Sequence, residues 1–328
     1  MDLIGTEIPR MGLGCWPIGG PFYAGDQALG YSNVDTVESF RVIDAAWDGG
    51  IRLFDTANVY GAGHAEYLLG QALEGRADAM ISSKIGMSFD ERTKQIGDEE
   101  TDPSGVMPAI ENSLRRLRRD RIDVLFLHLN DLPVKAAEPL FEEMDKARAQ
   151  GKVRSFGWST DFPKSVDAMA GIDGFSAVQH VMNVFFDAPS MRKAVERNRL
   201  VGFVRSPLAM GILTGKYKAD FKVPADDIRA MNSTVRDYFQ DGRPGAKYLA
   251  SLAAVHELLT QGGRTLAQGS LCWLMAKSEL HIPIPGARTV AQVEDNIGAL
   301  EHGALPHNVM EEIEAWLARE PEGAPRSR

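Results

Sequence analysis

Four side chains that can carry or stabilise a proton stand near the ends of short apolar runs in the sequence. Asp55 ends the first run, and Tyr60 follows it in a loop that reaches Gly61; Lys84 and His128 end the next two. A phenol has a pKa of about 10, so it donates protons poorly at neutral pH unless positive charge or hydrogen bonds stabilise the phenolate. The sequence therefore predicts a proton-transfer site if the fold brings these run ends together.

The elements that must position these residues alternate along the chain. Short apolar runs bounded by turn residues predict strands at 10–15, 51–54, 79–84, 122–128, 153–159, 177–181, 200–206 and 281–284. Helices are expected between and after them, at 36–48, 65–74, 104–118, 136–149, 163–170, 188–198, 265–277, 289–300 and 307–319. Eight strands that alternate with helices predict an α/β fold, a (β/α)8 TIM barrel with long loops after strands 3 and 7. We expect one domain over 1–318 and a flexible C-terminal tail over 319–328.

An open, doubly wound sheet is the competing architecture. If it bound a dinucleotide, it would carry GxGxxG between the first strand and the first helix. The stretch Met11-Gly-Leu-Gly-Cys-Trp16 has GxG without the third Gly, and Trp16 would crowd a pyrophosphate. The barrel is therefore favoured, and its active site is expected at the carboxyl ends of the strands. The predicted strand exits carry Asp55, Lys84, His128, Ser159, Gln179 with Asn183, Ser206, and Gly286 with Arg288.

Composition narrows the class of protein. The 328 residues can bury a large core, and the net charge of −9 argues against binding to nucleic acid. Two cysteines, Cys15 and Cys272, cannot form a disulfide framework and are expected to be reduced core residues. The sequence shows neither an apolar run of about 18 residues nor a signal segment, so we expect a soluble cytoplasmic protein without membrane contact. The oligomeric state stays open, with a monomer as the default.

Two further segments carry expectations. The charged loop 87–101 and the longer loop 217–247 exceed the usual length of a connection, and we expect them to set substrate selectivity. The helix at 104–118 has an apolar stripe, and the four arginines Arg115, Arg116, Arg118 and Arg119 lie mostly outside it. We interpret this basic run as a solvated face.

In their chain order, the motifs resemble those of the aldo-keto reductase superfamily, in the branch near the bacterial reductases that are like potassium-channel β subunits. Asp55-Thr-Ala-Asn-Val-Tyr60-Gly-Ala-Gly-His-Ala-Glu66, with Leu69-Gly70 after it, resembles the signature around the catalytic Asp and Tyr. Ser82-Ser-Lys84 and Asp123-Val-Leu-Phe-Leu-His128 resemble the segments of the catalytic Lys and His. Gly157-Trp-Ser159, Gln179 and Ser206-Pro-Leu-Ala209 resemble the nicotinamide and pyrophosphate segments, and Ile284-Pro-Gly-Ala-Arg288 with Gln292-Val-Glu-Asp-Asn296 resembles the adenosine phosphate site.

The resemblance implies NADPH-dependent reduction of an aldehyde or ketone to an alcohol, with no metal ion. Tyr60 would give its proton to the carbonyl oxygen, and Lys84, paired with Asp55, would bring the pKa of the phenol toward the working pH. His128 would donate a hydrogen bond to the carbonyl oxygen and orient it. The small-molecule carbonyl substrate itself is not specified by the sequence.

The resemblance also implies a set of cofactor-binding residues. They are Trp16, Asp55, Ser159, Gln179, Arg205, Ser206, Pro207, Leu208, Ala209, Gly211, Lys216, Arg229, Gly286, Arg288, Gln292, Asp295 and Asn296. Arg288 suits a 2′-phosphate, because a guanidinium can bind phosphate oxygens bidentately, and this favours NADPH/NADP+ over NADH. Arg205 departs from the family pattern, in which an aromatic residue at this position stacks on the nicotinamide.

The aromatic and apolar residues of the loops and strands are candidates for a substrate pocket. They are Trp16, Phe22, Tyr23, Met87, Phe89, Trp158, Phe185 and Tyr238, each of which could equally pack in the core or on the surface.

Two other functions compete with the reductase. One is an NADPH-binding regulatory or sensor protein that resembles the channel β subunits, with weak or no turnover. Those subunits carry Asn where this chain has His128, so the complete tetrad favours an enzyme. The other is a metal-dependent barrel hydrolase or lyase, for which His128 and Asp131 supply too few ligands.

Overall fold

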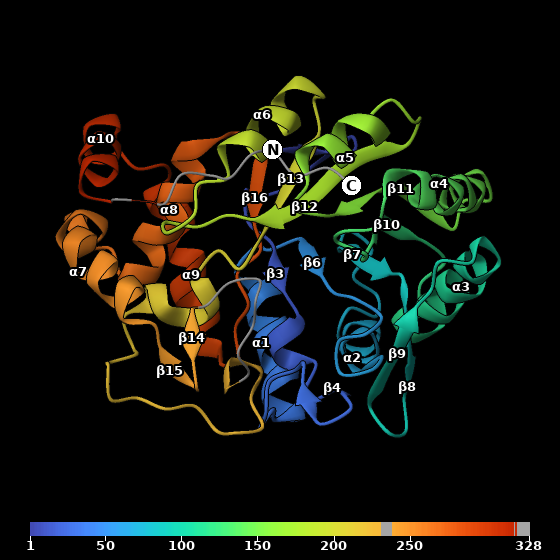
Figure 1. Ribbon diagram of the computed structural model, residues 1–328, viewed down its shortest axis with the longest axis horizontal. Helices are drawn as coiled ribbons and strands as arrows, with labels where there is room; N and C mark the ends of the chain where they lie inside the picture. The colour runs from blue at the N-terminus through green and yellow to red at the C-terminus, as the bar shows by residue number, and fades with distance from the viewer. Residues whose placement is uncertain (231–237, 318, 320–328) are drawn as a thin grey trace.

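Eight parallel strands form the central sheet, and each pairs with the next one along the chain (Figure 1). The computed structural model describes residues 1–230, 238–317 and 319. In pairing order the strands are β3 (Leu13–Gly14), β6 (Leu53–Asp55), β7 (Met80–Ile85), β10 (Ile122–Leu127), β11 (Val153–Ser159), β12 (Phe175–Val181), β13 (Val201–Arg205) and β16 (His281–Pro283). All eight predicted strands are therefore confirmed.

The first and last strands meet, so the sheet closes into a barrel. The amide of Gly12 donates to the carbonyl of Pro283, and that of Gly14 donates to the carbonyl of Pro285, each at 3.0 Å. Glycine is required at position 14, because a Cβ there would lie 2.6 Å from the carbonyl oxygen of Ile284. The (β/α)8 barrel is confirmed, and the carboxyl ends of its strands share one rim.

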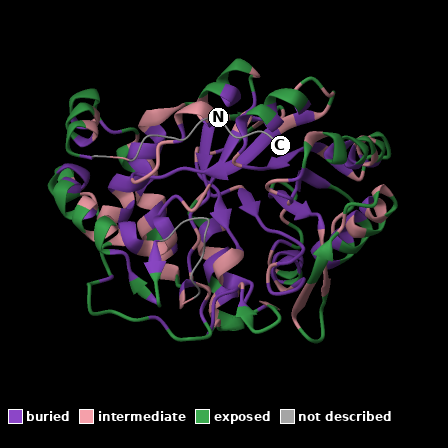
Figure 2. Cartoon of the chain, viewed as in Figure 1, coloured by how far each residue is buried: buried purple, intermediate pink, exposed green. Residues whose placement is uncertain are grey.

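Helices cover the outside of the sheet, and the strands are buried between them (Figure 2). They are α1 (Thr36–Asp48), α2 (His64–Ala72), α3 (Val106–Leu117), α4 (Val134–Ala149), α5 (Pro163–Met169), α6 (Pro189–Arg197), α8 (Leu266–Lys277) and α9 (Val290–His302), with α10 (His307–Trp316) at the end. Local sequence fixes their starts: the carboxylate of Asp35 caps α1, and Thr265 with Gln268 forms a capping box on α8. The nine predicted helices are confirmed.

One further helix was not predicted. The helix α7 (Ala246–Thr260) follows the loop after β13, and its buried side chains Leu252, Val255 and Leu258 recur at a helical spacing of three residues. The loop before it contains a short turn of 3₁₀ helix, η4 (Ile228–Ala230), and the two-residue strands β14 (Phe239–Gln240) and β15 (Arg243–Pro244). Residues 231–237 of the predicted loop lie outside the described residues.

The predicted loop after the third strand is a hairpin. Strands β8 (Met87–Asp90) and β9 (Gln95–Glu99) pair antiparallel, and β9 also pairs with β4 (Tyr23–Ala24). With β5 (Gln27–Ala28), these strands form a separate four-stranded sheet. The sequence reasoning missed this sheet because it joins two segments far apart in the chain.

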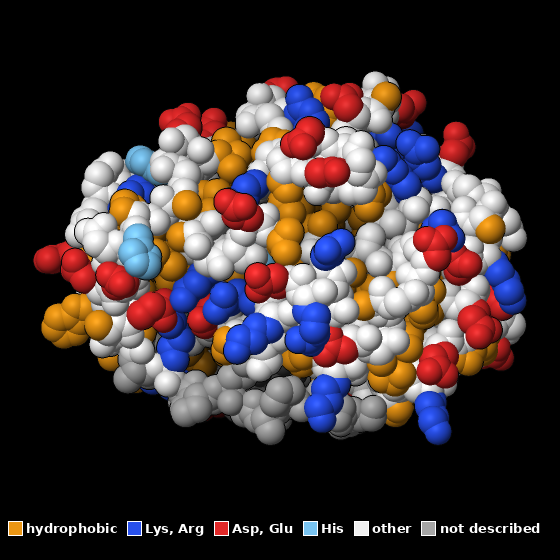
Figure 3. All heavy atoms as spheres, turned by 90° about the horizontal axis from the view of Figure 1, so that it is seen from above, with side chains coloured by type: hydrophobic (Ala, Val, Ile, Leu, Met, Phe, Trp, Pro, Cys, Tyr) orange, Lys and Arg blue, Asp and Glu red, His pale blue; other side chains and the backbone are white. Residues whose placement is uncertain are grey.

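At the end of the barrel opposite the carboxyl ends of the strands, the N-terminal hairpin of β1 (Asp2–Leu3) and β2 (Thr6–Glu7) closes the interior. Leu3 and Ile8 pack with the interior residues Leu53, Met80 and Phe126. On the face drawn in Figure 3, acidic and basic side chains lie among one another. None of the described helices is long and apolar enough to cross a membrane.

Two chain segments bear on the expected domain limits and on the basic run. Residues 320–328 of the predicted tail lie outside the described residues, whereas Arg319 donates to the carbonyl of Val184.

On α3, Arg115 and the following Arg118 are exposed, but Arg116 is buried with 3% of its surface exposed. The interpretation of the whole run as a solvated face is therefore wrong at Arg116.

Candidate active site

A buried ammonium group joins a carboxylate to a phenol at the rim of the barrel. Lys84 Nζ, near the end of β7, lies 2.8 Å from Asp55 Oδ2 at the end of β6 and 3.2 Å from Tyr60 Oη. It also donates to the carbonyl of Thr56 at 2.6 Å. The side chain of Lys84 has no exposed surface, and that of Asp55 has 4%. The structure thus brings together three of the four residues from which the sequence analysis began.

The carboxylate of Asp55 is held by two further donors. Ser82 Oγ and Gln179 Nε2 donate to its Oδ1 at 2.8 and 2.9 Å. Because side chains alternate along a strand, Ser82 and Lys84 both point into the barrel from β7. Asp55 is therefore fixed by neighbours on two strands and in turn fixes the position of Lys84.

Burial decides the direction of the pKa shifts in this group. Burial raises the pKa of Tyr60 above its ordinary value, and Lys84 opposes that rise. Burial alone would lower the pKa of Lys84, but the charges of Asp55 and Tyr60 outweigh it and the pKa is raised. The expected net lowering of the Tyr60 pKa is therefore wrong for the protein alone: Lys84 limits the rise instead of reversing it.

The imidazole of His128 lies beside the phenol. The ring centroids of Tyr60 and His128 are 6.2 Å apart, with an edge-to-face angle of 85°. Burial, with smaller contributions from Lys84 and Arg205, lowers the pKa of His128 to about 3. Its Nδ1 is buried without a hydrogen-bond partner among the described residues. His128 is thus a neutral imidazole with one ring nitrogen that has no partner among the described residues.

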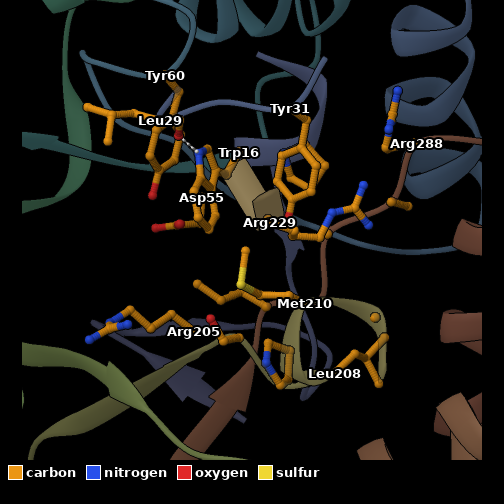
Figure 4. Close-up of a pocket in the computed structure, with 18 of the residues that line it drawn as sticks. Trp16, Leu29, Tyr31, Asp55, Tyr60, Arg205, Leu208, Met210, Arg229 and Arg288 are labelled. Carbon is orange, nitrogen blue, oxygen red and sulfur yellow. Dashed lines mark hydrogen bonds between the residues drawn. The ribbon is translucent and has the colours of Figure 1, made fainter. Parts of the chain in front are cut away.

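A cavity of about 580 Å³ opens over these residues. Figure 4 shows Tyr60 and Asp55 at one end and Arg229 and Arg288 at the other, with Trp16 and Tyr31 between them. This volume is typical of a site for a cofactor or another small molecule. Lys84 itself does not line the cavity, because it lies behind Tyr60 and Asp55.

Nearly all predicted cofactor residues line this cavity. They are Trp16, Asp55, Ser159, Gln179, Arg205, Ser206, Pro207, Leu208, Gly211, Lys216, Arg229, Gly286, Arg288, Gln292, Asp295 and Asn296. Ala209 is fully buried and does not line the cavity.

The backbone between β13 and Lys216 is strained. Ser206, Ala209 and Met210 have φ angles of 53°, 48° and 54°, in the left-handed region that residues other than Gly rarely adopt. Such conformations cost free energy and cluster where a chain wraps around a ligand. The segment therefore has the backbone expected of a ligand-binding loop.

Two arginines at the far end of the cavity are already held by the protein. Arg229 pairs with Asp227 at 2.7 Å and donates to Tyr217 Oη. Burial lowers the pKa of Arg229, but Asp227 and the aromatic neighbours outweigh that effect and the pKa is raised. Arg288 donates to the carbonyls of Ser32 and Asn33 at 2.7 and 2.6 Å. Both cations are preorganised at the end of the cavity opposite Tyr60.

Arg205, the predicted departure from the aromatic stacking residue, forms an ion pair with Asp161. Asp161 also accepts from the amide of Val181 at 2.9 Å. Arg205 therefore lines the cavity with its charge offset by Asp161, which is not itself a lining residue.

The predicted substrate pocket is only partly supported. Trp16, Phe22 and Met87 line the cavity, whereas Tyr23, Phe89, Trp158, Phe185 and Tyr238 do not. Trp158 alternates with Ser159 on β11, so it faces outward, where its Nε1 donates to the carbonyl of Leu129. Tyr238 is buried and its hydroxyl accepts from Asn183.

Several lining residues were missed by the sequence reasoning. They include Leu29, Tyr31, Ile96, Asn130 and Met210. Asn130 follows His128 by two residues at the same strand exit, which is a usable signal. Leu29 and Tyr31 come from the segment around the small sheet, where Trp16 Nε1 donates to the carbonyl of Leu29 at 3.1 Å (Figure 4). No local pattern indicated that contact. The described residues contain no cluster of His, Cys, Asp or Glu that could hold a metal ion.

Comparison with known proteins gives matches along nearly the whole chain. Residues 10–318 match the model of the Aldo/keto reductase family. The chain is 29% identical over 297 residues to aldo-keto reductase YhdN of Bacillus subtilis, with 88% of this chain and 84% of the relative covered. It is 27% identical over 311 residues to aldo-keto reductase yakc of Schizosaccharomyces pombe, whose name specifies NADP(+), with 91% and 86% covered.

Solved structures agree with the sequence matches. The glycerol dehydrogenase AKR11B4 from Gluconobacter oxydans superposes with a TM-score of 0.80 at 27% identity, covering 98% of this chain and 96% of the other. An aldo-keto reductase from Klebsiella pneumoniae in complex with NADPH has a TM-score of 0.68 at 22% identity, with 98% and 95% covered, and shares the fold.

Proposed function

Because the chain belongs to the aldo/keto reductase family, we propose that it reduces aldehydes and ketones to alcohols with NADPH, and that Tyr60 donates the proton. As a member of this family the protein is an oxidoreductase. The observation that carries the proposal is the ammonium of Lys84, held between Asp55 and the hydroxyl of Tyr60 at the edge of a deep cavity. A buried phenol in contact with a fixed cation is a proton donor whose anion is stabilised in advance.

The residues of the cavity fit a nicotinamide dinucleotide. A bound NADPH supplies the hydride that reduces the carbonyl carbon. Ser159 and Gln179 are polar groups near Asp55, suited to a carboxamide, and Lys216, Arg229 and Arg288 supply positive charge for phosphates. The names of the yeast relative and the Klebsiella structure, which specify NADP(+) and NADPH, support the phosphorylated cofactor.

The chain's own residues account for the proton and the developing charge. As the carbonyl oxygen gains negative charge, Tyr60 Oη gives it a proton, and Lys84 stabilises the phenolate that remains. Neutral His128, which lines the cavity beside Tyr60, donates a hydrogen bond to the same oxygen. Trp16, Phe22 and Met87 exclude water from the reacting end of the cavity.

Two measurements test the proposal on the full-length protein. Fluorescence titration with NADPH and NADH should give the tighter dissociation constant for NADPH. Oxidation of NADPH should then proceed with a panel of aromatic aldehydes. Tyr60→Phe should lower turnover by about 10²–10⁴-fold, the usual contribution of a positioned proton donor, and leave the dissociation constant for NADPH unchanged.

Each failure has a distinct meaning. Full turnover by Tyr60→Phe contradicts the assignment of Tyr60 as the proton donor. Tight binding of NADPH without oxidation by any aldehyde or ketone contradicts the enzyme and supports the sensor. Absence of binding to either nucleotide contradicts both.

A further inference from the structure

Arg116 is a buried cation that the catalytic mechanism does not use. It lies on α3, outside the barrel, and only 3% of its surface is exposed. Its side chain passes over Gly63, where an added Cβ would lie 2.9 Å from Arg116 Cδ. The chain therefore leaves room for this guanidinium between helices α2 and α3.

One arm of Arg116 is linked through Glu66 to the back of the catalytic strand. Its Nε donates to Glu66 Oε2 at 2.7 Å, and the other oxygen of Glu66 accepts from Ser83 Oγ at 2.5 Å. Ser83 precedes Lys84 on β7 and points outward where Lys84 points inward. Glu66 thus holds β7 from the side opposite Asp55.

The other arm of Arg116 reaches the hairpin that borders the cavity. Its Nη1 donates to Glu91 Oε1 at 3.2 Å, next to the turn between β8 and β9. The guanidinium also lies 5.3 Å from the ring centroid of Phe89. On the same hairpin, Met87 and Ile96 line the cavity. One guanidinium is therefore linked through Glu66 to the strand that carries Lys84, and directly through Glu91 to the hairpin that borders the cavity.

A second contact fixes the same hairpin to the catalytic loop. Lys94 Nζ donates at 2.9 Å to the carbonyl of Gly61, the residue after Tyr60. The hairpin is thus tied on one side to the loop of the proton donor and on the other to the strand of its ammonium partner.

We propose that Arg116 is a positioning residue that sets how tightly bulky carbonyl substrates bind, by holding the hairpin wall in register with the catalytic strand. The proposal rests on the reductase function above. A buried ion pair adds little stability over an apolar packing, because desolvation of the charges offsets their attraction. Its consequence here is geometric: Glu91, Arg116, Glu66 and Ser83 link the hairpin that carries Met87 and Ile96 to the strand that carries Lys84.

Glu91→Ala tests the link without disturbing the buried pair, because the side chain of Glu91 is 43% exposed. We expect the KM for 2-naphthaldehyde to rise about fivefold with kcat within about twofold, as for a loss of uniform binding. The KM for propanal, which is too small to fill the pocket, should stay unchanged. Hydrogen exchange of the hairpin amides at 87–99 should become faster, and that of Met80–Ile85 should not.

Glu74→Ala is the matched control. It removes an exposed ion pair between Glu74 and Arg118, which caps the carboxyl end of α3, the helix that carries Arg116. It should change neither KM nor hairpin exchange. Arg116→Lys keeps the charge but cannot reach two carboxylates at once, so it should raise the KM for 2-naphthaldehyde as Glu91→Ala does. The double variant Arg116→Lys/Glu91→Ala should add nothing further.

The proposal is overturned if Glu91→Ala behaves as Glu74→Ala does, or if the KM for both aldehydes rises equally. Faster hairpin exchange with no reduction of any carbonyl by the unaltered protein would uphold the mechanical link and reject the reductase function. Normal exchange with normal turnover would reject the link alone.

Discussion

Strand β7 has a buried charge cluster on each of its two faces, and comparing the two clusters shows which features distinguish a reacting site from a structural one. The barrel-side cluster consists of Asp55, Tyr60 and Lys84, and the helix-side cluster of Glu66, Ser83 and Arg116. The ion pair of each cluster is nearly inaccessible to solvent, and its donor and acceptor atoms lie under 3 Å apart. Burial and pairing alone therefore do not distinguish the two.

The clusters differ in what their hydrogen-bonding groups face. On the helix side, both oxygens of Glu66 accept hydrogen bonds, and the three nitrogens of Arg116 donate to Glu66, Glu91 and Ser113. On the barrel side, Tyr60 and His128 line the cavity, and His128 Nδ1 lacks a partner among the described residues. Titratable side chains that line a cavity and have shifted pKa values mark the side where chemistry is expected.

The largest effect should follow from removing the barrel-side cation. Lys84→Met deletes the charge that stabilises the phenolate of Tyr60, and we expect kcat/KM to fall about 10³-fold. The variant should also unfold more easily, by about 3 kcal/mol, because Asp55 is left buried without its cation. Steady-state kinetics with a saturating aldehyde and urea denaturation measure the two effects.

Glu66→Gln is the counterpart on the helix side. It leaves Arg116 as an uncompensated buried cation, so the free energy of unfolding should fall by about 3 kcal/mol. The kcat of the folded variant should remain within about threefold of the unaltered protein, since the carboxamide oxygen of the new side chain can still accept from Ser83. If Glu66→Gln lost as much kcat as Lys84→Met, the division between a chemical and a structural face would be wrong.

The catalytic rate and the stability of the protein should depend differently on pH. Burial, Lys84 and Arg205 lower the pKa of His128 to about 3, and burial raises that of Tyr60. Both groups therefore stay in their working states between about pH 5 and pH 8, and kcat for reduction should vary little there. Above the ordinary pKa of a tyrosine, loss of the Tyr60 proton should lower kcat for reduction. A decrease in kcat on lowering the pH, with a midpoint near pH 6.5, would instead show that His128 gains a proton in the folded enzyme and would contradict the prediction.

The free energy of unfolding should change with pH in the acidic range. The pKa of buried His180 is lowered to about 4, so below its unfolded pKa of about 6.5 the unfolded chain binds a proton that the folded chain does not. His128 and His281 are shifted in the same direction. The free energy of unfolding should therefore fall as the pH drops from about 6.5 toward 4, which urea denaturation at several pH values measures. Constant stability over this range would contradict the buried neutral imidazoles.

Much of the barrel-side cluster could be predicted because its signals are local. Most of the strands are short apolar runs that carry a polar residue at or near the carboxyl end, as at Asp55 and Gln179. Closure of the barrel then places ends that are far apart in the chain next to one another. The sequence order of the motifs also sufficed to name most residues that line one side of the cavity, whose role in binding a cofactor stays a prediction.

The helix-side cluster could not be predicted for the opposite reason. Arg116 is buried because Gly63 leaves space and because Glu66 and Glu91 approach from two other elements. Its own neighbours in the sequence, Arg115 and Arg118, are exposed. Nothing local distinguishes these arginines.

The cavity wall shows the same limit. The hairpin of β8 and β9 is short and polar. Its strands pair with each other, and β9 also pairs with β4, more than sixty residues away in the sequence (Figure 1). Trp158 was an avoidable error, because the inward position of Ser159 fixes its neighbour outward.

The smallest expected effects make the sharpest test, because they come from neighbouring residues of one type. Ser82 and Ser83 are adjacent on β7 and fully buried, and each hydroxyl donates to a carboxylate, of Asp55 and of Glu66 respectively. Ser82→Ala removes one of the donors that orient Asp55, so we expect kcat/KM to fall about three- to fivefold. Ser83→Ala should leave kcat/KM unchanged and lower the free energy of unfolding by about 1–2 kcal/mol, the usual loss for a hydrogen bond to a charged group.

Loss of stability should accompany Ser82→Ala as well, since Asp55 also loses a donor, so the discriminating quantity is kcat/KM measured on folded protein well below the unfolding temperature. The two variants remove the same atom from the same strand and differ only in the face of the sheet. Equal kinetic effects would mean that β7 transmits any disturbance to Lys84 regardless of its side. A loss confined to Ser82→Ala would mean that the strand isolates the reacting groups from the packing behind them, and that Arg116 acts through the hairpin wall instead of through Lys84.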